Sequence, residues 1–353
     1  MIRDYISYEL QRASGQIEGL TQQEGNIRKA ENREKRKETE EKVKKARKNL
    51  LADLPPTITY EFLDVTTHKA SAIDFRSTWQ EKNRRVDDCL QEHIKTWREG
   101  SRYYKDIFES PKINLAILPL YSFLVQFTFT LDQPYISRDE QDFYIIDNPV
   151  RKDKIFGLPY VASTSWKGSL RAALWHSEGK EDDHPSIRHL FGNKKGNEDS
   201  NDFQAGCLYF YPTFFTSKSL EVINPQNRKL RVGEKPIPFE SVPTGTSGVF
   251  TLLYIPFDLV GADEQKTREQ VAQELQLICR GLQAMFRTHG FGAKTSSGFG
   301  LARESLQNVL LEIRATGIQK LSESLIGFEE LVKRVTGLKQ SLVGSLEEVQ
   351  HEQ

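Results

Sequence analysis

An eleven-residue segment at positions 290–300, Gly-Phe-Gly-Ala-Lys-Thr-Ser-Ser-Gly-Phe-Gly, combines four glycines with one lysine and three hydroxyl side chains. Because glycine has no side chain, the backbone N–H groups of such a segment can approach a phosphate closely. Lys294 adds a positive charge, and the hydroxyls of Thr295 and Ser296 add donors for phosphate oxygens or a ribose 2′-OH. The segment is therefore suited to bind an extended phosphodiester backbone.

The spacing is not that of a phosphate-binding P-loop. That motif has a glycine directly before the lysine and a helix after the loop, whereas here Ala293 precedes Lys294 and the helical pattern comes before the loop. A dinucleotide-binding fingerprint is excluded for the same reason. Glycine content alone also fits a hairpin that needs glycine only for its tight turns. A ligand-binding loop and a plain hairpin both remain open.

Composition limits the kind of protein that this chain can be. Its 353 residues suggest about two domains, and 37% hydrophobic residues are enough for a core. Lysine and arginine together number 49, equal to the 49 aspartates and glutamates. The whole-molecule charge therefore does not attract nucleic acid, and any such site must be a local patch.

The cysteines indicate the compartment. Cys89, Cys207 and Cys279 lie far apart without C-x-x-C spacing, which is typical of reduced cytoplasmic thiols and argues against a structural zinc site. The first residues do not resemble a signal peptide, and no stretch approaches the roughly 20 apolar residues of a membrane span. The sequence predicts a soluble, cytoplasmic protein with no membrane partner.

Hydrophobic periodicity predicts the elements that surround the glycine-rich segment. A helical, highly charged N-terminal extension is expected over residues 1–110, and it includes a solvated helix over 26–50 that could also contact RNA or a partner. Residues 121–130 alternate and are rich in aromatic and β-branched types, which predicts a strand. Strand-like segments recur at 207–215 and 249–260.

Two helices are predicted between these strands and the glycine-rich segment. The first begins at Ser163 or Thr164, and the second has apolar residues at 271, 275, 278, 282 and 285. Lys167 and Arg171 lie four residues apart on one face of the first helix. Two cations near its opening turns could hold phosphates, aided by the positive end of the helix dipole. An ordinary surface lysine remains the alternative for Lys167.

The tail repeats apolar residues at near-heptad spacing from Ile318 to Leu346. This pattern predicts an amphipathic helix in a C-terminal extension over 305–353, docked on the body or on a partner. Residues 111–304 then hold strand, helix, strands, helix and glycine-rich loop. That order predicts an α+β, ferredoxin-like core with insertions, the architecture of RRM domains.

Several strings of this core occur together and in order. They are Ile-Asp-Asn-Pro-Val at 146–150, Gly-Leu-Pro-Tyr-Val at 157–161, Ser-Trp-Lys-Gly-Ser-Leu-Arg at 165–171 and the glycine-rich segment. The combination, which covers residues 120–302, resembles the RAMP superfamily and within it the backbone subunits of type III CRISPR interference complexes. The chain departs from that pattern in two places. Ala162-Ser163 replaces the family's Pro-Gly. The loop residues directly before Asp139, at 135–138, lack the two glycines of the family pattern.

The resemblance implies a subunit that holds crRNA along a filament, contacts target RNA and assembles with other CRISPR effector subunits. In catalytic members, an aspartate on the loop after the first core strand supports cleavage of target RNA by the ribose 2′-OH, with a divalent metal, Mg²⁺ or Mn²⁺, as cofactor. Asp139 stands where that aspartate would lie, with Asp142 and then Asp132 as alternatives. From the residues alone, an ordinary solvated acidic loop is the favoured interpretation of this segment.

The same resemblance implies a set of RNA contacts. The residues expected to touch phosphate or ribose are Lys167, Arg171, Gly292, Lys294, Thr295 and Ser296, with Asn148 and Arg151 as further candidates. Contacts of this kind carry no sequence information. They suit a protein that holds a guide, because base pairing of the guide reads the target.

Two other functions remain open. A crRNA-processing endonuclease of the same superfamily would use a histidine as general base. The candidates are His68, His93, His184, His189 and His289, none of which lies in a recognisable constellation with a lysine. A non-catalytic structural or capping subunit fits the neutral charge, the extra helices and the missing glycines before Asp139.

Overall fold

The structure is a computed structural model that describes the following residues: 110–138, 148–153, 157–193, 204–223, 226–227, 232–233, 237–315 and 318–344. The chain divides into two compact units. The larger unit comprises residues 103–138, 150–221 and 239–353, and the smaller unit comprises 1–102, 139–149 and 222–238. The predicted charged helix over 26–50 lies outside the described residues, as do Asp139 and Asp142.

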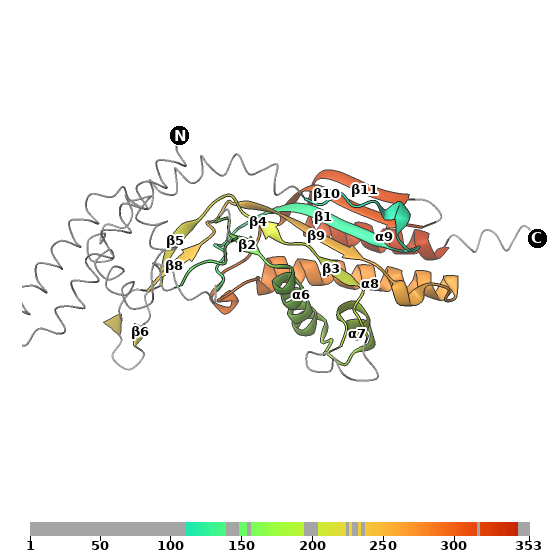
Figure 1. The fold of residues 1–353 in the computed structure, drawn as a ribbon, viewed down its shortest axis with the longest axis horizontal. Coiled ribbons are helices and arrows are strands. Elements are labelled where there is room, and N and C mark those ends of the chain that lie inside the picture. Colours follow the sequence, from blue (N-terminus) through green and yellow to red (C-terminus); the bar gives the residue numbers. More distant parts are fainter. Residues whose placement is uncertain are drawn as a thin grey trace, which may run out of the picture. The chain divides into compact units, whose positions relative to one another are not determined.

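A five-stranded antiparallel sheet organises the larger unit (Figure 1). Its strands, in spatial order, are β11 (Ile318–Gly327), β10 (Ser305–Arg314), β1 (Phe123–Thr130), β9 (Ser247–Tyr254) and β3 (Leu208–Phe210). The strand predicted over 121–130 is confirmed as β1, which lies at the centre of the sheet. Its alternation has the expected cause, since Phe123, Val125, Phe127 and Phe129 are all buried.

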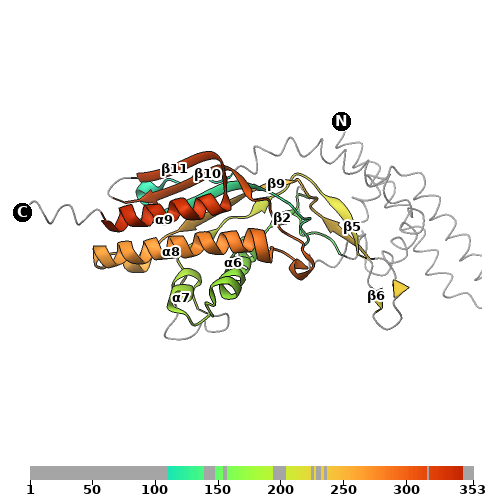
Figure 2. The same ribbon diagram turned by 180° about the vertical axis from the view of Figure 1, so that it is seen from behind.

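Helices cover one face of this sheet, as Figures 1 and 2 show. They are α6 (Ser163–Glu178), α7 (Pro185–Phe191), α8 (Glu264–Ala284) and α9 (Phe328–Gly344). Both predicted internal helices, α6 and α8, are confirmed. Asp263 caps α8 by accepting a hydrogen bond from the N–H of Lys266 at 2.9 Å. The predicted apolar stripe of α8 is buried against the sheet.

Chain order and sheet order together describe the core. With α7, the short strands β2 and β4–β8 and the single helical turns set aside, the chain order is β1, α6, β3, β9, α8 and β10, and these strands lie in the spatial order β10-β1-β9-β3. This is a β-α-β-β-α-β connectivity. The predicted α+β class is confirmed. Among the described residues, no helix has the length and apolar character to cross a membrane.

Shorter elements complete the description. The two-residue strands β2 (Tyr160–Val161) and β4 (Thr213–Phe214) pair, as do β5 (Ser219–Ile223) with β8 (Ile237–Ser241), and β6 (Gln226–Asn227) with β7 (Val232–Gly233). Single turns of 3-10 helix occur at η2 (Leu115–Ile117), η3 (Phe257–Leu259) and η5 (Thr295–Ser297). A π-helical turn, η4 (Met285–His289), extends α8.

The prediction for the tail was wrong over its first half. Residues 305–327 form the β10–β11 hairpin, and the helix begins only at Phe328. The cause is tertiary. β10 pairs with β1 along its length and buries Leu306, Val309, Leu311 and Ile313 beneath the helices. The apolar residues at near-heptad spacing from Ile318 therefore lie first in β11 and then in α9. The sheet extends past residue 304.

Candidate functional site

The glycine-rich loop is joined to the segment that leaves β1. The N–H of Ala293 donates to the carbonyl of Ile136 at 2.7 Å, and the N–H of Gly300 donates to the carbonyl of Pro134 at 2.9 Å. The N–H of Phe291 donates to the carbonyl of Gly300 at 3.0 Å and closes the loop. The loop and residues 131–138 therefore hold each other in place.

The glycines of the loop are required by its backbone and its packing. Gly292 has φ 93°, and a β-carbon there would lie 2.5 Å from the carbonyl oxygen of Ile136. Gly300 has φ 72°, and a β-carbon there would lie 2.0 Å from the carbonyl oxygen of Phe291. The hairpin interpretation accounts for these glycines. It does not account for the polar residues at the tip.

The tip of the loop presents polar groups to solvent. Lys294 is exposed and has left-handed backbone geometry, with φ 56°. Its Nζ lies 4.8 Å from the centroid of the Phe239 ring, a cation–π contact that holds the ammonium group to one side. Thr295 and Ser296 open the turn η5, and among the described residues their N–H groups have no acceptor. A cation, hydroxyls and main-chain donors therefore meet in one exposed turn.

One aromatic side chain anchors this loop in the core. Phe291 is buried, and its ring centroid lies 4.6 Å from that of Trp166 in the first turns of α6 and 5.7 Å from that of Phe129 at the end of β1. The indole N–H of Trp166 donates to the hydroxyl of Thr213 at 3.1 Å. The opening of α6 and the base of the loop therefore share one cluster, which places Lys167 on the turn that contacts the loop.

Lys167 and Arg171 differ in their surroundings. Lys167 is half-buried, and burial lowers the pKa of its ammonium group, with the charge of Arg171 lowering it further. The Nε of Arg171 donates to Oδ1 of Asp182 at 2.7 Å. Arg171 is thus already paired with a carboxylate of its own unit, in the turn that follows α6.

A third segment, residues 150–153, contacts the loop that follows β1. The N–H of Arg151 donates to the hydroxyl of Ser137 at 2.7 Å, and its Nε donates to the hydroxyl of Tyr160 at 2.9 Å. The neighbouring Lys152 forms a buried ion pair with Glu240 on β8, with 2.9 Å between Nζ and Oε2. This pair anchors the backbone while the side chain of Arg151 stays exposed.

The remaining predicted residues are only partly placed. Asn148 lies half-buried in a bend of the smaller unit. Asp139 and Asp142 lie outside the described residues, but the segment that leads to them is held at Ile136 and Ser137. The exposed Asp132 uses its N–H to bond the carbonyl of Leu301 at 2.9 Å.

Histidines proposed as general bases have internal contacts. His184 caps α7, accepting from the N–H of Ser186 at 3.2 Å. The ring of His289 lies 5.5 Å from that of His176, and its pKa is lowered by burial and then by His176. His189 is buried between Glu274 and Asp258. His68 and His93 lie outside the described part of the chain.

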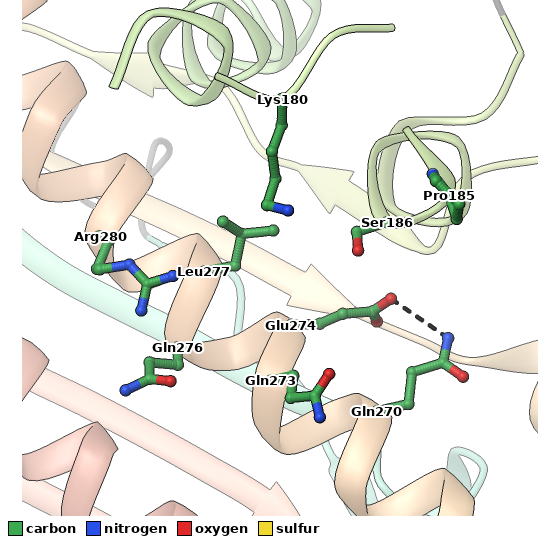
Figure 3. A pocket seen from close by; sticks show the side chains of 9 residues that line it. All are labelled: Lys180, Pro185, Ser186, Gln270, Gln273, Glu274, Gln276, Leu277 and Arg280. Atoms are coloured by element: carbon green, nitrogen blue, oxygen red, sulfur yellow. Dashed lines mark hydrogen bonds between the residues drawn. The ribbon is translucent and has the colours of Figure 1, made fainter. Parts of the chain in front are cut away.

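A pocket of about 420 Å³ lies between α8 and the connection from α6 to α7 (Figure 3). Its lining includes Lys180, Glu274 and Arg280, together with three glutamines of α8. None of the predicted site residues lines it. Sequence reasoning also missed a cluster of His189, Cys207 and Asp258 beside it, because positions so far apart form no motif.

Comparison with known proteins agrees with the motifs. The model of the RAMP superfamily matches residues 128–303. A protein of Mycobacterium tuberculosis, CRISPR system Cms endoribonuclease Csm3, is 28% identical over 185 residues, which cover 45% of this chain and 75% of that protein. Its namesake from Streptococcus thermophilus is 27% identical over 165 residues, covering 44% of this chain and 73% of that protein.

Chains of two solved CRISPR complexes are among the structural matches of this chain. A chain of the type III-B Cmr-beta complex bound to cognate target RNA has a TM-score of 0.42 and 13% identity, covering 77% of this chain and 92% of that one. A chain of a CRISPR RNA-guided surveillance complex has a TM-score of 0.38 and 16% identity, covering 54% of this chain and 68% of that one.

The matched span runs from β1 through the glycine-rich loop, and it contains the three segments that meet around residues 134–137. The strings on which the resemblance was based, at 146–150, 157–161, 165–171 and 290–300, all fall within it. This chain belongs to the RAMP superfamily.

Proposed function

We propose that this chain is a crRNA-binding subunit of a type III CRISPR effector complex, where it assembles with other effector subunits and contacts target RNA. Membership of the RAMP superfamily and similarity to two proteins named Csm3 support the assignment. The cytoplasmic location stays a prediction. The single observation that carries the RNA-binding role is the exposed tip of the glycine-rich loop, where Lys294 and free N–H groups stand together.

The tip is built for a sugar-phosphate strand rather than for a base. Backbone donors and a cation can pair with any phosphate, and the hydroxyls of Thr295 and Ser296 can reach a phosphate oxygen or a ribose 2′-OH. Lys167 and Arg151 extend the same surface as weaker contributors. Arg171 contributes least, because its pairing with Asp182 already neutralises its charge.

The proposal also includes cleavage of target RNA. The catalytic group is Asp139, with Asp142 as the alternative, acting with Mg²⁺ or Mn²⁺. The attacking 2′-OH must lie in line with the leaving oxygen, which requires a nucleotide splayed out of helical geometry. The support lies in the anchoring of Ile136 and Ser137, which fixes the start of the segment that carries Asp139.

RNA binding is tested with Lys294→Ala, and Lys266→Ala is the matched control because Lys266 is an exposed lysine on the far end of α8. Lys294→Ala should weaken guide retention and reduce the slope of log affinity against log salt by about 1. Lys266→Ala should leave both unchanged. Equal retention and equal slopes for the two variants would reject the loop as an RNA contact.

Cleavage is tested in the assembled complex with Asp139→Ala and Asp142→Ala, and Asp183→Ala, an exposed carboxylate between α6 and α7, serves as control. Loss of one target cut with unchanged assembly identifies the catalytic aspartate. An unaltered set of cuts in both variants would make the chain a structural or capping subunit. For the processing alternative, the isolated chain would have to cut a repeat RNA without metal, and we expect that it does not.

A further inference from the structure

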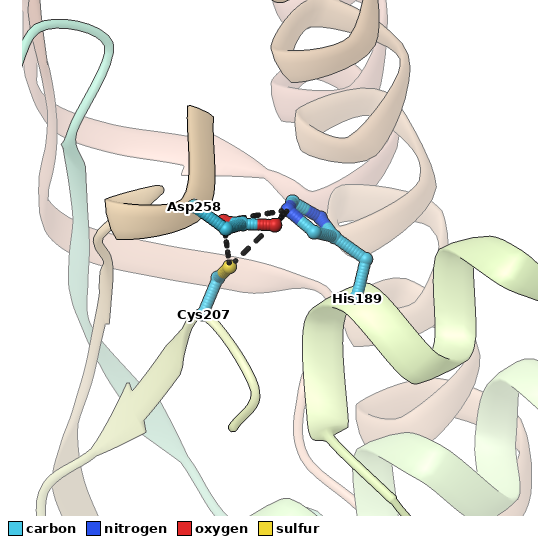
Figure 4. A group of neighbouring side chains, drawn as sticks. All are labelled: His189, Cys207 and Asp258. Atoms are coloured by element: carbon cyan, nitrogen blue, oxygen red, sulfur yellow. Dashed lines mark hydrogen bonds and ion pairs between the residues drawn. The ribbon is translucent and has the colours of Figure 1, made fainter. Parts of the chain in front are cut away.

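Three side chains from distant parts of the chain meet beside α8 (Figure 4). His189 comes from α7, Cys207 directly precedes β3, and Asp258 lies in the turn η3. Sγ of Cys207 lies 3.3 Å from Nε2 of His189 and 3.5 Å from Oδ1 of Asp258. Nε2 of His189 lies 3.0 Å from Oδ2 of Asp258. Thiol, imidazole and carboxylate therefore converge on one point.

These separations resemble those of metal ligands. Tetrahedral zinc has bonds of about 2.3 Å to sulfur and about 2.0–2.2 Å to nitrogen and oxygen, which place its ligand atoms roughly 3.3–3.6 Å apart. The three atoms of the cluster are already close to that spacing, and small side-chain movements would admit an ion. We propose that His189, Cys207 and Asp258 bind a Zn²⁺ ion.

The choice of zinc follows from the donor set. Magnesium and calcium select oxygen ligands, whereas a thiolate combined with an imidazole suits zinc. Three protein ligands leave a fourth tetrahedral position. The side chain of Asp258 is 44% exposed, so solvent reaches the cluster and can supply a water molecule as the fourth ligand.

An outer layer of contacts orients the histidine. Oε1 of Glu274 lies 2.6 Å from Nδ1 of His189, and the other carboxylate oxygen accepts from the hydroxyl of Tyr254 at 2.7 Å. A carboxylate at Nδ1 favours the tautomer whose Nε2 lone pair faces the cluster. This carboxylate–histidine arrangement is the usual support of a zinc-bound imidazole.

The backbone that carries the ligands is held independently of any ion. The N–H of Cys207 donates to the carbonyl of His189 at 3.0 Å, and the N–H of Ile255 donates to the carbonyl of Cys207 at 2.9 Å. Gly206 lies so close to α7 that a β-carbon there would be 2.4 Å from the carbonyl carbon of Phe191. The ion would therefore link α7, β3 and η3 across a preformed site.

The zinc site is separate from the proposed RNA surface. Glu274 lies midway along α8, and the glycine-rich loop follows the end of that helix. At about 1.5 Å per residue, half of α8 alone spans roughly 15 Å. The inference therefore stands whether or not the chain binds RNA, and its test contains no RNA.

The test uses the full-length protein, stripped of metal with a chelator and titrated with Co²⁺. Cobalt occupies zinc sites and gives a thiolate-to-metal charge-transfer band when cysteine is a ligand. We expect one equivalent of bound Co²⁺ with this band, displaced by Zn²⁺. Cys207→Ser should abolish the band, and Glu274→Gln should weaken binding by about 10- to 100-fold.

Controls exclude metal bound elsewhere. Cys279→Ser removes a buried thiol of α8 outside the cluster. Cys89→Ser removes the third cysteine of the chain. Both variants should keep the band. If Cys207→Ser fails to fold, Asp258→Asn tests the site instead, because this exposed side chain can be changed without opening the core. Asp258→Asn should weaken Co²⁺ binding at least 10-fold. A band that survives Cys207→Ser, full affinity in Asp258→Asn, or wild-type protein that binds no Co²⁺ at micromolar concentration would overturn the proposal.

Discussion

Gly292 approaches Ile136 so closely that a β-carbon at position 292 would lie 2.5 Å from the carbonyl oxygen of Ile136. The N–H of Ala293 donates to that same oxygen at 2.7 Å. The contact joins the loop that presents Lys294 to the segment that leads toward Asp139. The glycine-rich loop and the segment that follows β1 are therefore held together at a position that only glycine can fill.

Substitution of Gly292 by alanine should displace the loop. Gly298 is the matched control, because its φ of 86° is also left-handed but a β-carbon there would meet nothing within 4 Å. Both variants share the cost of a left-handed residue, about 1–2 kcal/mol. Gly292→Ala should lose a further 1–3 kcal/mol, roughly the cost of overpacking. Chemical denaturation measures the difference, and equal losses would show that the approach to Ile136 adds nothing.

The buried pair of Lys152 and Glu240 should show strong coupling. The two side chains are only 6% and 2% exposed, so the loss of one charge removes a buried counterion of the other. Lys152→Met or Glu240→Gln alone should cost about 3–5 kcal/mol of unfolding free energy. The double variant should cost clearly less than the sum, because both single losses include the same ion pair. Additive losses in a double-mutant cycle would contradict this account.

Truncation of the tail tests its place in the sheet. A chain that ends at residue 304 lacks β10, the neighbour of β1, and should show no cooperative thermal transition by circular dichroism. A chain that ends at residue 344 keeps every described element and should unfold like the full-length protein. Cooperative unfolding of the shorter chain at an unchanged midpoint would mean that the hairpin is dispensable.

Local patterns explain what could be predicted. The alternation of β1 and the apolar stripe of α8 are properties of short stretches, so they were visible before any contact was known. The glycine-rich loop was recognisable for the same reason, since unusual backbone geometry demands a particular residue type. The motif strings added the family, because each string is a run of neighbouring residues that can be read from the sequence.

Contacts between distant residues could not be predicted. Ile318 and Leu321 fit a helical period, but the open edge of β10 decides that they form a strand. Arg171 had the spacing of a phosphate ligand, and only the fold reveals its bond to Asp182.

The sequence by itself therefore determined β1, α6, α8, the presence of the glycine-rich loop and the family, because these depend on neighbours along the chain. The tertiary structure alone decided the β10–β11 hairpin and the meeting of His189, Cys207 and Asp258. The spacing of the cysteines along the chain predicted that they form no structural zinc site. Spacing along the chain does not show which side chains meet in the folded protein. Side chains from three separate elements can converge on one ion when the backbone folds them together, and no linear motif records that event.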